Sequence, residues 1–284
     1  MTVALVTAGA ARSLDTDLPL LQAALTRLGI DSEVVSWDDA TLVWGRFATI
    51  VVRSTWDYTG RLDTFLEWAA SAAEAAPLFN PRPLLQWSTD KRYLADLAAA
   101  GVAIVPTRFC ARGSAAELPD RPFVVKPSVG AGSVGVARFT PDEREAALEH
   151  VARLHDAGHV ALIQPYLDAV DRRGETALVY FAGSFSHAIR KSAILVEGLQ
   201  MVDGLYAAEK IARAQPTTAE LALAEAALAA VPGRDRPLYA RVDVVPAEDG
   251  TPRLLELELC EPSLFLEYDE GAADRLAAAI AALT

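Results

Sequence analysis

The sequence is poor in the residues that build disulfide frameworks and soft-metal centres. It contains 2 cysteines and 4 histidines among 284 residues. Cys110 and Cys260 show no motif spacing, so they are predicted to be buried thiols, and a cysteine-based metal site has no support. His155 and His159 are four residues apart, but no H-E-x-x-H motif accompanies them, so we expect no metal there.

Basic residues are also scarce, and long apolar runs are missing. The formal net charge is −12. This charge repels nucleic-acid phosphates and anionic lipid, so neither nucleic acid nor a membrane is expected as a partner. No stretch approaches the ~18 consecutive apolar residues of a membrane-spanning helix, and the first residues lack the basic segment of a signal peptide. A cytoplasmic protein is therefore predicted.

Hydrophobic residues make up 52% of the chain, which is enough for sizeable cores, and the length favours two domains. Up to residue 87, short apolar runs alternate with amphipathic segments, a pattern typical of a small parallel α/β sheet. Pro77, Pro81 and Pro83 then mark a boundary, so we expect one domain over 1–87 and another over 88–284. The first domain is expected to have strands at 3–6, 32–36 and 49–53, and helices at 18–28 and around 65–68.

In the second domain, Ser88-Thr89-Asp90 is interpreted as the cap of a helix that carries Lys91 and ends at Gly101. Residues 192–215 are either a lid that includes Met201, Tyr206 and Glu209 or an ordinary surface excursion. The other expected elements are strands at 102–105, 123–125, 136–139 and 160–164, a helix at 142–157, a hairpin of 176–181 and 184–190, an alanine-rich helix, and strands at 238–245 and 253–259.

A glycine-rich loop separates two of these strands. The letters GAGSVG at 130–135 match the dinucleotide-binding pattern G-x-G-x-x-G. That fold needs a helix that starts inside the motif, whereas 136–139 is expected to continue as a strand. A loop between strands can instead cover phosphates with its N–H groups, and Lys126 adds a cation. We predict a polyphosphate ligand; a plain surface turn with a solvated Lys126, or an NAD-dependent oxidoreductase, is the alternative.

Three carboxylates occupy the last expected hairpin. Glu256 and Glu258 are two residues apart on a strand and therefore share a face, and Asp243 on the partner strand can lie opposite them. Carboxylate oxygens are ligands for Mg²⁺, which completes its shell with water and substrate phosphates. The sequence therefore predicts a magnesium site there; the alternative is solvated acids on an edge strand.

Taken in chain order, these motifs resemble the ATP-grasp superfamily over almost the whole chain. The resemblance is carried by Thr89-Asp90-Lys91, Val125-Lys126-Pro127, the loop 128–135, the segment 163–167, Gly174-Glu175, Arg241-Val242-Asp243 and Glu256-Leu257-Glu258. Within the superfamily, the segments 53–58, 186–191 and 255–266 resemble the group that contains the O-ureidoserine cyclo-ligase of cycloserine biosynthesis. The resemblance implies an α/β and α+β fold, in which a pre-ATP-grasp domain over 1–87 precedes an ATP-grasp domain with lobes of about 88–164 and 165–284.

The resemblance also implies ATP and Mg²⁺ as cofactors and assigns their residues. The implied nucleotide-binding residues are Lys91, Lys126, Ser128, Gly130, Gly132, Ser133, Gln164, Leu167 and Glu175, with Asp171 as the substitute for Glu175. The implied magnesium ligands are Asp243, Glu256 and Glu258. Many family members carry Asn in place of Glu258, which leaves the number of ions open. Lys191 and Arg241 are implied to stabilise the transferred phosphoryl group; a solvated strand end is the alternative for Arg190-Lys191.

The second substrate has candidate contacts in the first domain. Arg53, Ser54 and Asp57 follow an expected strand at its carboxyl end, where α/β sheets place ligands. Arg53 could hold a carboxylate and Asp57 an ammonium group; a helix-capping Asp57 beside a packed Trp56 is an equal alternative. His187 could be a base or donor in the cleft, or a packed strand residue.

The function predicted from these motifs is a Mg-ATP-dependent ligase that activates a small amino-acid-like carboxylate as an acyl phosphate. An intramolecular amide-forming cyclisation is the first form of this reaction considered, and an intermolecular amino-acid or peptide ligase is the second. A nucleotide-binding protein without catalysis is a further alternative from a different class. The expected partner is a small-molecule carboxylate, and a homodimer is left open.

Overall fold

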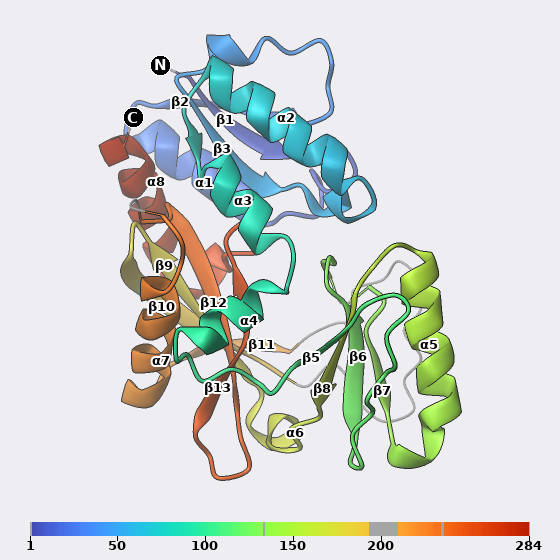
Figure 1. Cartoon of the computed structure of the whole chain (residues 1–284). Coiled ribbons are helices and arrows are strands. Elements are labelled where there is room, and N and C mark those ends of the chain that lie inside the picture. The colour runs from blue at the N-terminus through green and yellow to red at the C-terminus, as the bar shows by residue number, and fades with distance from the viewer. Residues whose placement is uncertain (1, 133, 193–209, 234–235, 284) are drawn as a thin grey trace.

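The computed structural model describes residues 2–132, 134–192, 210–233 and 236–283, and it begins with a parallel four-stranded sheet (Figure 1). Its order is β2-β1-β3-β4, from β1 (Thr2–Thr7), β2 (Asp31–Ser36), β3 (Thr49–Ser54) and β4 (Leu78–Phe79). Alternate residues of β1 serve different cores: Val3 and Leu5 pack with helix α1 (Asp17–Arg27), while Ala4 and Val6 pack with α2 (Leu62–Ala75). The period of two in the strand therefore puts helices on both faces of the sheet.

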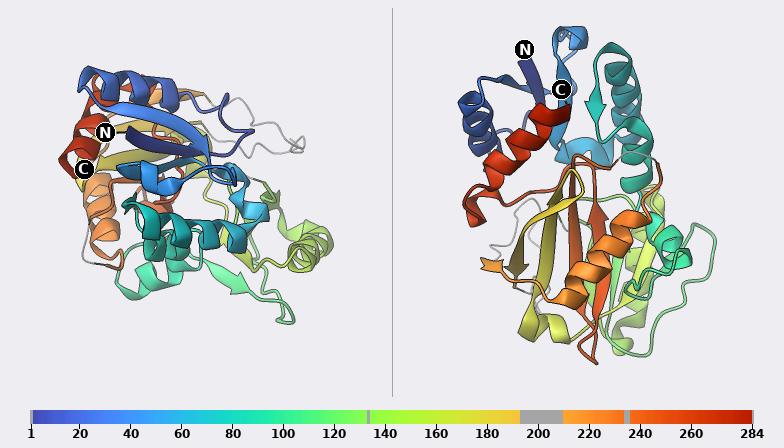
Figure 2. Two further views of the ribbon diagram at one scale, coloured as in Figure 1. Left: turned by 90° about the horizontal axis from the view of Figure 1, so that it is seen from above. Right: turned by 90° about the vertical axis from the view of Figure 1, so that its left-hand side faces the viewer.

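The end of the chain returns to this first unit. Helix α8 (Ala272–Leu283) lies beside α1, and its Leu276 and Ile280 belong to the core that Leu21 and Leu25 of α1 fill (Figure 2). The same core includes Tyr239 of the second sheet, so the first unit and the rest of the chain share buried apolar surface.

A second sheet of five antiparallel strands has the order β11-β10-β9-β12-β13. Its turn between β9 and β10 is tight, because Ala182 and Gly183 both have positive φ, +47° and +78°, as the favoured two-residue hairpin turns require. Helices α4 (Tyr93–Ala99) and α7 (Thr218–Ala229) contribute to the core under this sheet. The strands are β9 (Glu175–Phe181), β10 (Ser184–Lys191), β11 (Ile211–Ala214), β12 (Tyr239–Pro246) and β13 (Pro252–Glu258).

A third sheet of four strands, in the order β5-β8-β6-β7, lies beside the second (Figure 1). Helix α5 (Arg144–Asp156) packs on it through Val151 and Leu154, which share a core with Phe123. The strands are β5 (Arg108–Cys110), β6 (Phe123–Pro127), β7 (Ala137–Phe139) and β8 (Ala161–Pro165). The connecting helices are α3 (Arg82–Ser88) and α6 (Ala169–Arg173), with short 3₁₀ turns at Trp44–Arg46, Trp56–Gly60, Pro141–Glu143 and Leu266–Tyr268.

Most of the expected elements are present, including the parallel sheet and both hairpins. The expected helix with Lys91 is wrong at its start: α3 ends at Ser88, α4 begins at Tyr93, and Lys91 lies between them. Pro83 lies in the first turn of the earlier helix α3, and the N-cap of α4 is Arg92, which has no side-chain capping hydrogen bond. The Asp90 carboxylate accepts from the Arg92 backbone N–H in the turn between the two helices. Segment 102–105 is not a strand, since it makes only an isolated bridge between Ile104 and Leu254.

The remaining expectations concern the cysteines, membrane-spanning helices and residues of the glycine-rich loop and of segment 192–215. Cys110 and Cys260 are free and buried, as predicted. Among the described residues, none of the helices has the length and apolar character to cross a membrane. Met201, Tyr206 and Glu209 lie outside the described residues, as does Ser133.

Candidate active site

A cavity of about 540 Å³ takes its walls from the second and third sheets. The third sheet contributes Lys126 and Gln164, and the second contributes side chains from β9, β10, β12 and β13. Gly130 and Gly132 of the glycine-rich loop line it as well, and so does the segment that follows β13. Lys126 and Glu256, 130 residues apart in the chain, therefore line the same cavity.

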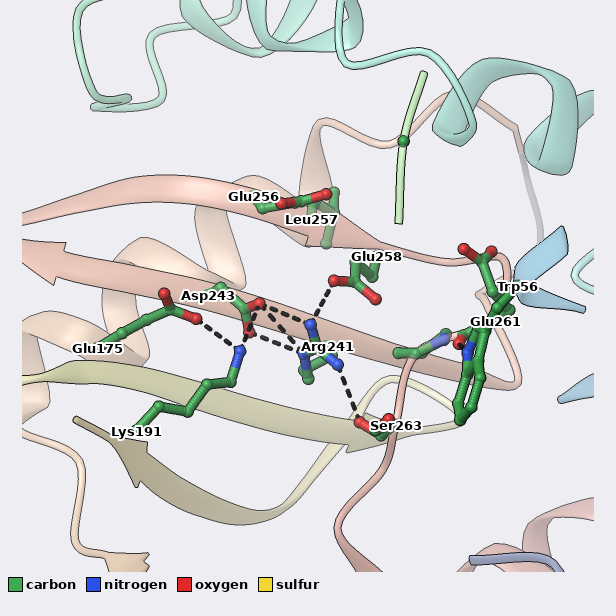
Figure 3. Close-up of polar contacts among 12 residues, drawn as sticks. Trp56, Glu175, Lys191, Arg241, Asp243, Glu256, Leu257, Glu258, Glu261 and Ser263 are labelled. Carbon is green, nitrogen blue, oxygen red and sulfur yellow. Dashed lines mark hydrogen bonds and ion pairs between the residues drawn. The ribbon is translucent and has the colours of Figure 1, made fainter. Parts of the chain in front are cut away.

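The hairpin wall is a connected set of ion pairs (Figure 3). Asp243 pairs in register with Glu256, while Leu257 points into the core under the sheet. The Arg241 guanidinium donates to the Asp243 carboxylate at 2.8 and 2.9 Å and also pairs with Glu258. Lys191 Nζ lies 2.6 Å from Glu175 and 3.3 Å from Asp243. Lys191 is 7% exposed, so the alternative of a solvated strand end does not hold for it.

The two carboxylates that share Arg241 differ in their proton affinity. Burial alone would raise the pKa of Asp243, but Arg241 and Lys191 outweigh it and lower the pKa to about 2. Burial raises the pKa of Glu258 to about 8. Arg241 lowers this pKa, but the negative charges of Glu256 and Asp243 raise it again. At neutral pH Asp243 is therefore an anion, whereas Glu258 favours its protonated form until a further cation binds nearby.

The opposite wall has cations with fewer partners. Lys91 Nζ lies 2.9 Å from the Glu256 carboxylate and donates to the Gly130 carbonyl at 2.7 Å, which ties the glycine-rich loop to the hairpin. Lys126 is 7% exposed, and no carboxylate of the described chain lies within 4 Å of its Nζ. Burial and the nearby Lys91 charge lower the pKa of Lys126. This lysine is a cation that faces the cavity without an ion-pair partner.

One end of the cavity is apolar. Val105, Leu167 and Val245 form a small cluster there, and Val170 and Leu255 pack against it. Gln164 lies at the edge, where its side-chain amide donates to the Thr107 hydroxyl at 2.8 Å. A slot of aliphatic side chains with polar groups at its rim suits a flat aromatic base. Sequence reasoning found Gln164 and Leu167 but missed Val105 and Val245, because isolated valines carry no motif.

Several predicted nucleotide-binding residues take other positions. Ser128 does not line the cavity; its carbonyl accepts from the Lys91 backbone N–H at 2.7 Å. Asp171 bonds to the Tyr166 hydroxyl, so Glu175, and not its substitute, is on the wall. Gly174 precedes Glu175 with φ +71°, and a Cβ there would lie 2.4 Å from the Lys191 carbonyl oxygen. Only glycine allows the start of β9 to approach the end of β10 so closely.

The four predicted substrate residues do not line the cavity. Arg53 is 1% exposed, lies 3.7 Å from Asp17 and donates to the Pro262 carbonyl at 2.9 Å. His187 Nε2 lies 2.9 Å from the Leu264 carbonyl oxygen, which agrees with the packed-residue alternative. Asp57 accepts from the Trp37 indole N–H and pairs with Arg61, while the Ser54 hydroxyl bonds to Thr7.

Arg53 instead helps to hold the segment that closes the cavity. Asp17, which sequence reasoning missed, accepts the backbone N–H groups of Leu264 and Leu266 at 2.6 and 2.8 Å. Between them Phe265 adopts φ +52°, and its ring lies 5.5 Å from the Arg241 guanidinium and 5.8 Å from Lys191 Nζ. A left-handed non-glycine residue is costly unless its surroundings impose it, so Asp17 and Arg53 are positioning residues for this wall.

The donor set fits magnesium by its chemistry. Asp243, Glu256 and Glu258 all line the cavity and offer carboxylate oxygens from adjacent strands. In the described part of the chain no three His, Cys, Asp or Glu side chains form a ready-made metal centre. Arg241, Lys191 and Lys91 engage these carboxylates at present. An ion that takes most of its ligands from phosphates and water needs no complete protein cage.

The three-sheet arrangement defines the ATP-grasp fold. The same architecture occurs in the RimK domain ATP-grasp protein from Sphaerobacter thermophilus, with a TM-score of 0.69 and 19% identity over 99% of this chain and 100% of that one. In the described residues, Gly135 is followed by strand β7 and not by the helix that the dinucleotide-binding fold needs. The alternative of an NAD-dependent oxidoreductase is therefore wrong.

The particular branch of the family is also clear. The chain is 42% identical to the cycloserine biosynthesis protein DcsG of Streptomyces lavendulae, over 98% of this chain and 97% of the relative. The crystal structure of D-cycloserine synthetase DcsG superposes with a TM-score of 0.91 and 39% identity, over 100% of this chain and 99% of that one. Residues 3–80 match the family model of the D-cycloserine synthetase DcsG N-terminal domain. The chain belongs to the DcsG family of ATP-grasp ligases and is an ATP-dependent ligase.

Proposed function

We propose that the chain is a Mg-ATP-dependent ligase that activates the carboxylate of an O-ureidoserine-like amino acid and closes a cyclic amide. The observation that supports this most directly is the shared cavity, in which a partner-free Lys126 faces an ion-paired acidic hairpin. The relative's role in cycloserine biosynthesis supports the substrate class. In this proposal residues 1–87 are the substrate domain and 88–284 the nucleotide domain, with the second substrate between them.

The proposed roles follow the positions of the side chains. Adenine occupies the apolar end near Gln164 and Leu167, where Glu175 could reach the ribose hydroxyls. Lys91, Lys126 and the N–H groups around Gly130 and Gly132 hold the phosphates, and Asp243, Glu256 and Glu258 hold magnesium. When bound there, the metal would supply positive charge that offsets the charge of the phosphates.

The reaction brings the substrate carboxylate close to the phosphates of ATP, and the cations of the cavity offset these negative charges. A carboxylate oxygen attacks the γ-phosphorus, the bond to the bridging oxygen breaks, and ADP leaves. Lys191 and Arg241 lie where charge on the transferred phosphoryl group can be stabilised. A nitrogen of the same substrate then attacks the acyl carbon; the amide forms, phosphate leaves and the nitrogen loses a proton. Phe265 and the loop exclude water that would hydrolyse the acyl phosphate.

The test is product analysis with purified protein, ATP, magnesium and each enantiomer of O-ureidoserine. We expect ADP and inorganic phosphate in equal amounts, and a cyclic product from this single amino acid. Formation of AMP, or absence of nucleotide turnover, would contradict the proposal. A requirement for a separate amine would favour the intermolecular ligase.

A further inference from the structure

One carboxylate on the cavity wall lacks a basic partner. Glu261 follows β13, is 7% exposed and lines the cavity. Within the described chain, no Lys, Arg or His nitrogen lies within 4 Å of its carboxylate. The other four cavity carboxylates, Glu175, Asp243, Glu256 and Glu258, each have such a partner. Burying a carboxylate without a counter-ion is costly, so a ligand that brings positive charge is expected to satisfy it.

The surroundings of Glu261 are built and polar. The Trp56 indole N–H donates to the Glu261 backbone carbonyl at 3.1 Å, and the Tyr58 hydroxyl and the Cys260 thiol interact with its carboxyl group. Trp56 and Tyr58 also line the cavity. Figure 3 shows Trp56 and Glu261 at one end of the polar cluster, while Glu175 and Lys191 lie at the other. This end joins a buried carboxyl group to aromatic side chains, a combination that suits an ammonium ion.

The distribution of charge along the cavity separates the two substrates. The phosphates of the nucleotide are anionic and are accounted for by Lys91, Lys126, Lys191 and Arg241. A phosphate at Glu261 would meet electrostatic repulsion. The end of the cavity at Glu261 therefore suits a part of the second substrate that is not anionic.

We propose that Glu261 binds the α-ammonium group of the amino-acid substrate and, with Trp56 and Tyr58, determines specificity for amino acids over carboxylic acids that lack this group. This inference rests on the proposed ligase function. It moves the ammonium contact from Asp57, whose carboxylate is engaged by Trp37 and Arg61 outside the cavity wall, to Glu261.

The experiment compares O-ureidoserine with 3-(ureidooxy)propanoate, which lacks only the α-ammonium group. Wild type is expected to prefer the amino acid by about 100-fold in kcat/KM, because a buried charge-assisted contact is lost with the other probe. Glu261→Gln should reduce the preference to below about tenfold, mainly through KM for the amino acid. The KM for ATP and the magnesium dependence should not change. Glu267→Gln, an exposed position outside the cavity wall, is the matched control and should behave as wild type.

Two further variants keep the test decisive if Glu261→Gln folds poorly. Glu261→Asp retains the charge and should retain part of the preference, and Tyr58→Phe should lower it by about threefold to tenfold through loss of one hydrogen bond. An undiminished preference in these variants would overturn the inference, and so would a raised magnesium requirement with the preference intact. Absence of ADP release by wild type with both probes would overturn the ligase proposal itself.

Discussion

The two walls of the cavity are built on different principles. The β12–β13 hairpin holds Asp243 and Glu258 in ion pairs with Arg241 and Lys191, so these side chains are positioned within one wall. The wall formed by β6 and the glycine-rich loop offers Lys126 with no ion pair, and Lys91 as the link to Glu256. One wall therefore has its charges paired within the protein, whereas the other keeps a buried cation without an ion-pair partner, which the proposed function assigns to the nucleotide phosphates.

The largest expected effect is on catalysis and concerns the hairpin wall. Glu256→Gln keeps the shape of the side chain but removes the charge that faces Lys126 and Lys91. We expect kcat to fall by about 10³-fold, because the proposed metal site loses a carboxylate. The circular dichroism spectrum should stay that of the folded protein, whereas the melting temperature should fall, because buried Lys91 loses its ion-pair partner. Glu248→Gln, exposed in the turn of the same hairpin, is the control. Normal turnover by Glu256→Gln would remove Glu256 from the metal site.

The second prediction compares substitutions of Lys91 and Lys126, the two lysines of the opposite wall. Lys91→Met leaves Glu256 without its partner in a buried site, so the free energy of unfolding should fall by about 3 kcal/mol. Lys126→Met removes a buried cation that has no ion pair and should change stability little, while the affinity for ATP falls by about 10- to 100-fold. Urea unfolding of the free proteins and ATP titration measure the two effects. Equal destabilisation by both substitutions would contradict the difference between the walls.

The smallest expected effect is a pH dependence within the hairpin wall. In the folded protein the pKa of Glu258 is raised to about 8, so the folded state keeps a proton that the unfolded chain releases above its usual pKa of 4.5. The free energy of unfolding without magnesium should therefore fall as pH rises from about 5 to 8, by an amount on the order of 2 kcal/mol from this group. The side chain is 25% exposed, and water screens part of the effect.

Glu258→Gln resembles the protonated carboxyl group and should lack this fall. Urea unfolding in the presence of a chelator, at pH 5, 6.5 and 8, provides the measurement. A parallel decline in wild type and variant would show that Glu258 does not retain its proton. Magnesium with ATP should diminish the decline in wild type, since a bound cation favours the ionised carboxylate.

The local sequence pattern was sufficient to predict the parallel first sheet and the two hairpins. A common ligand for Lys126 and Glu256 followed from the ATP-grasp resemblance, because no local pattern relates residues 130 positions apart. The sheet and the hairpins depend on short-range periodicity, and the same alternation puts Glu256 and Glu258 on one face of β13. The strand after Gly135 distinguishes the glycine-rich loop from that of the dinucleotide-binding fold. The start of α4 was wrong because Ser88, Thr89 and Asp90 all favour a helix N-cap, whereas α4 begins after Arg92, which has no side-chain capping bond.

Only the tertiary structure decided the contacts around the second substrate. Arg53 has the chemistry of a carboxylate ligand, yet the pairing of its guanidinium with Asp17 and Pro262 makes it a support for the segment 262–266. Glu261 belongs to segment 255–266, to which the resemblance gave no residue roles, and its lack of a basic partner depends on where cations from distant segments, such as Lys91 and Lys126, come to lie. Spacing along one strand determines which side chains share a face. Whether a buried charge has a partner depends instead on contacts between distant segments, and these contacts determine which residues remain free to bind a ligand.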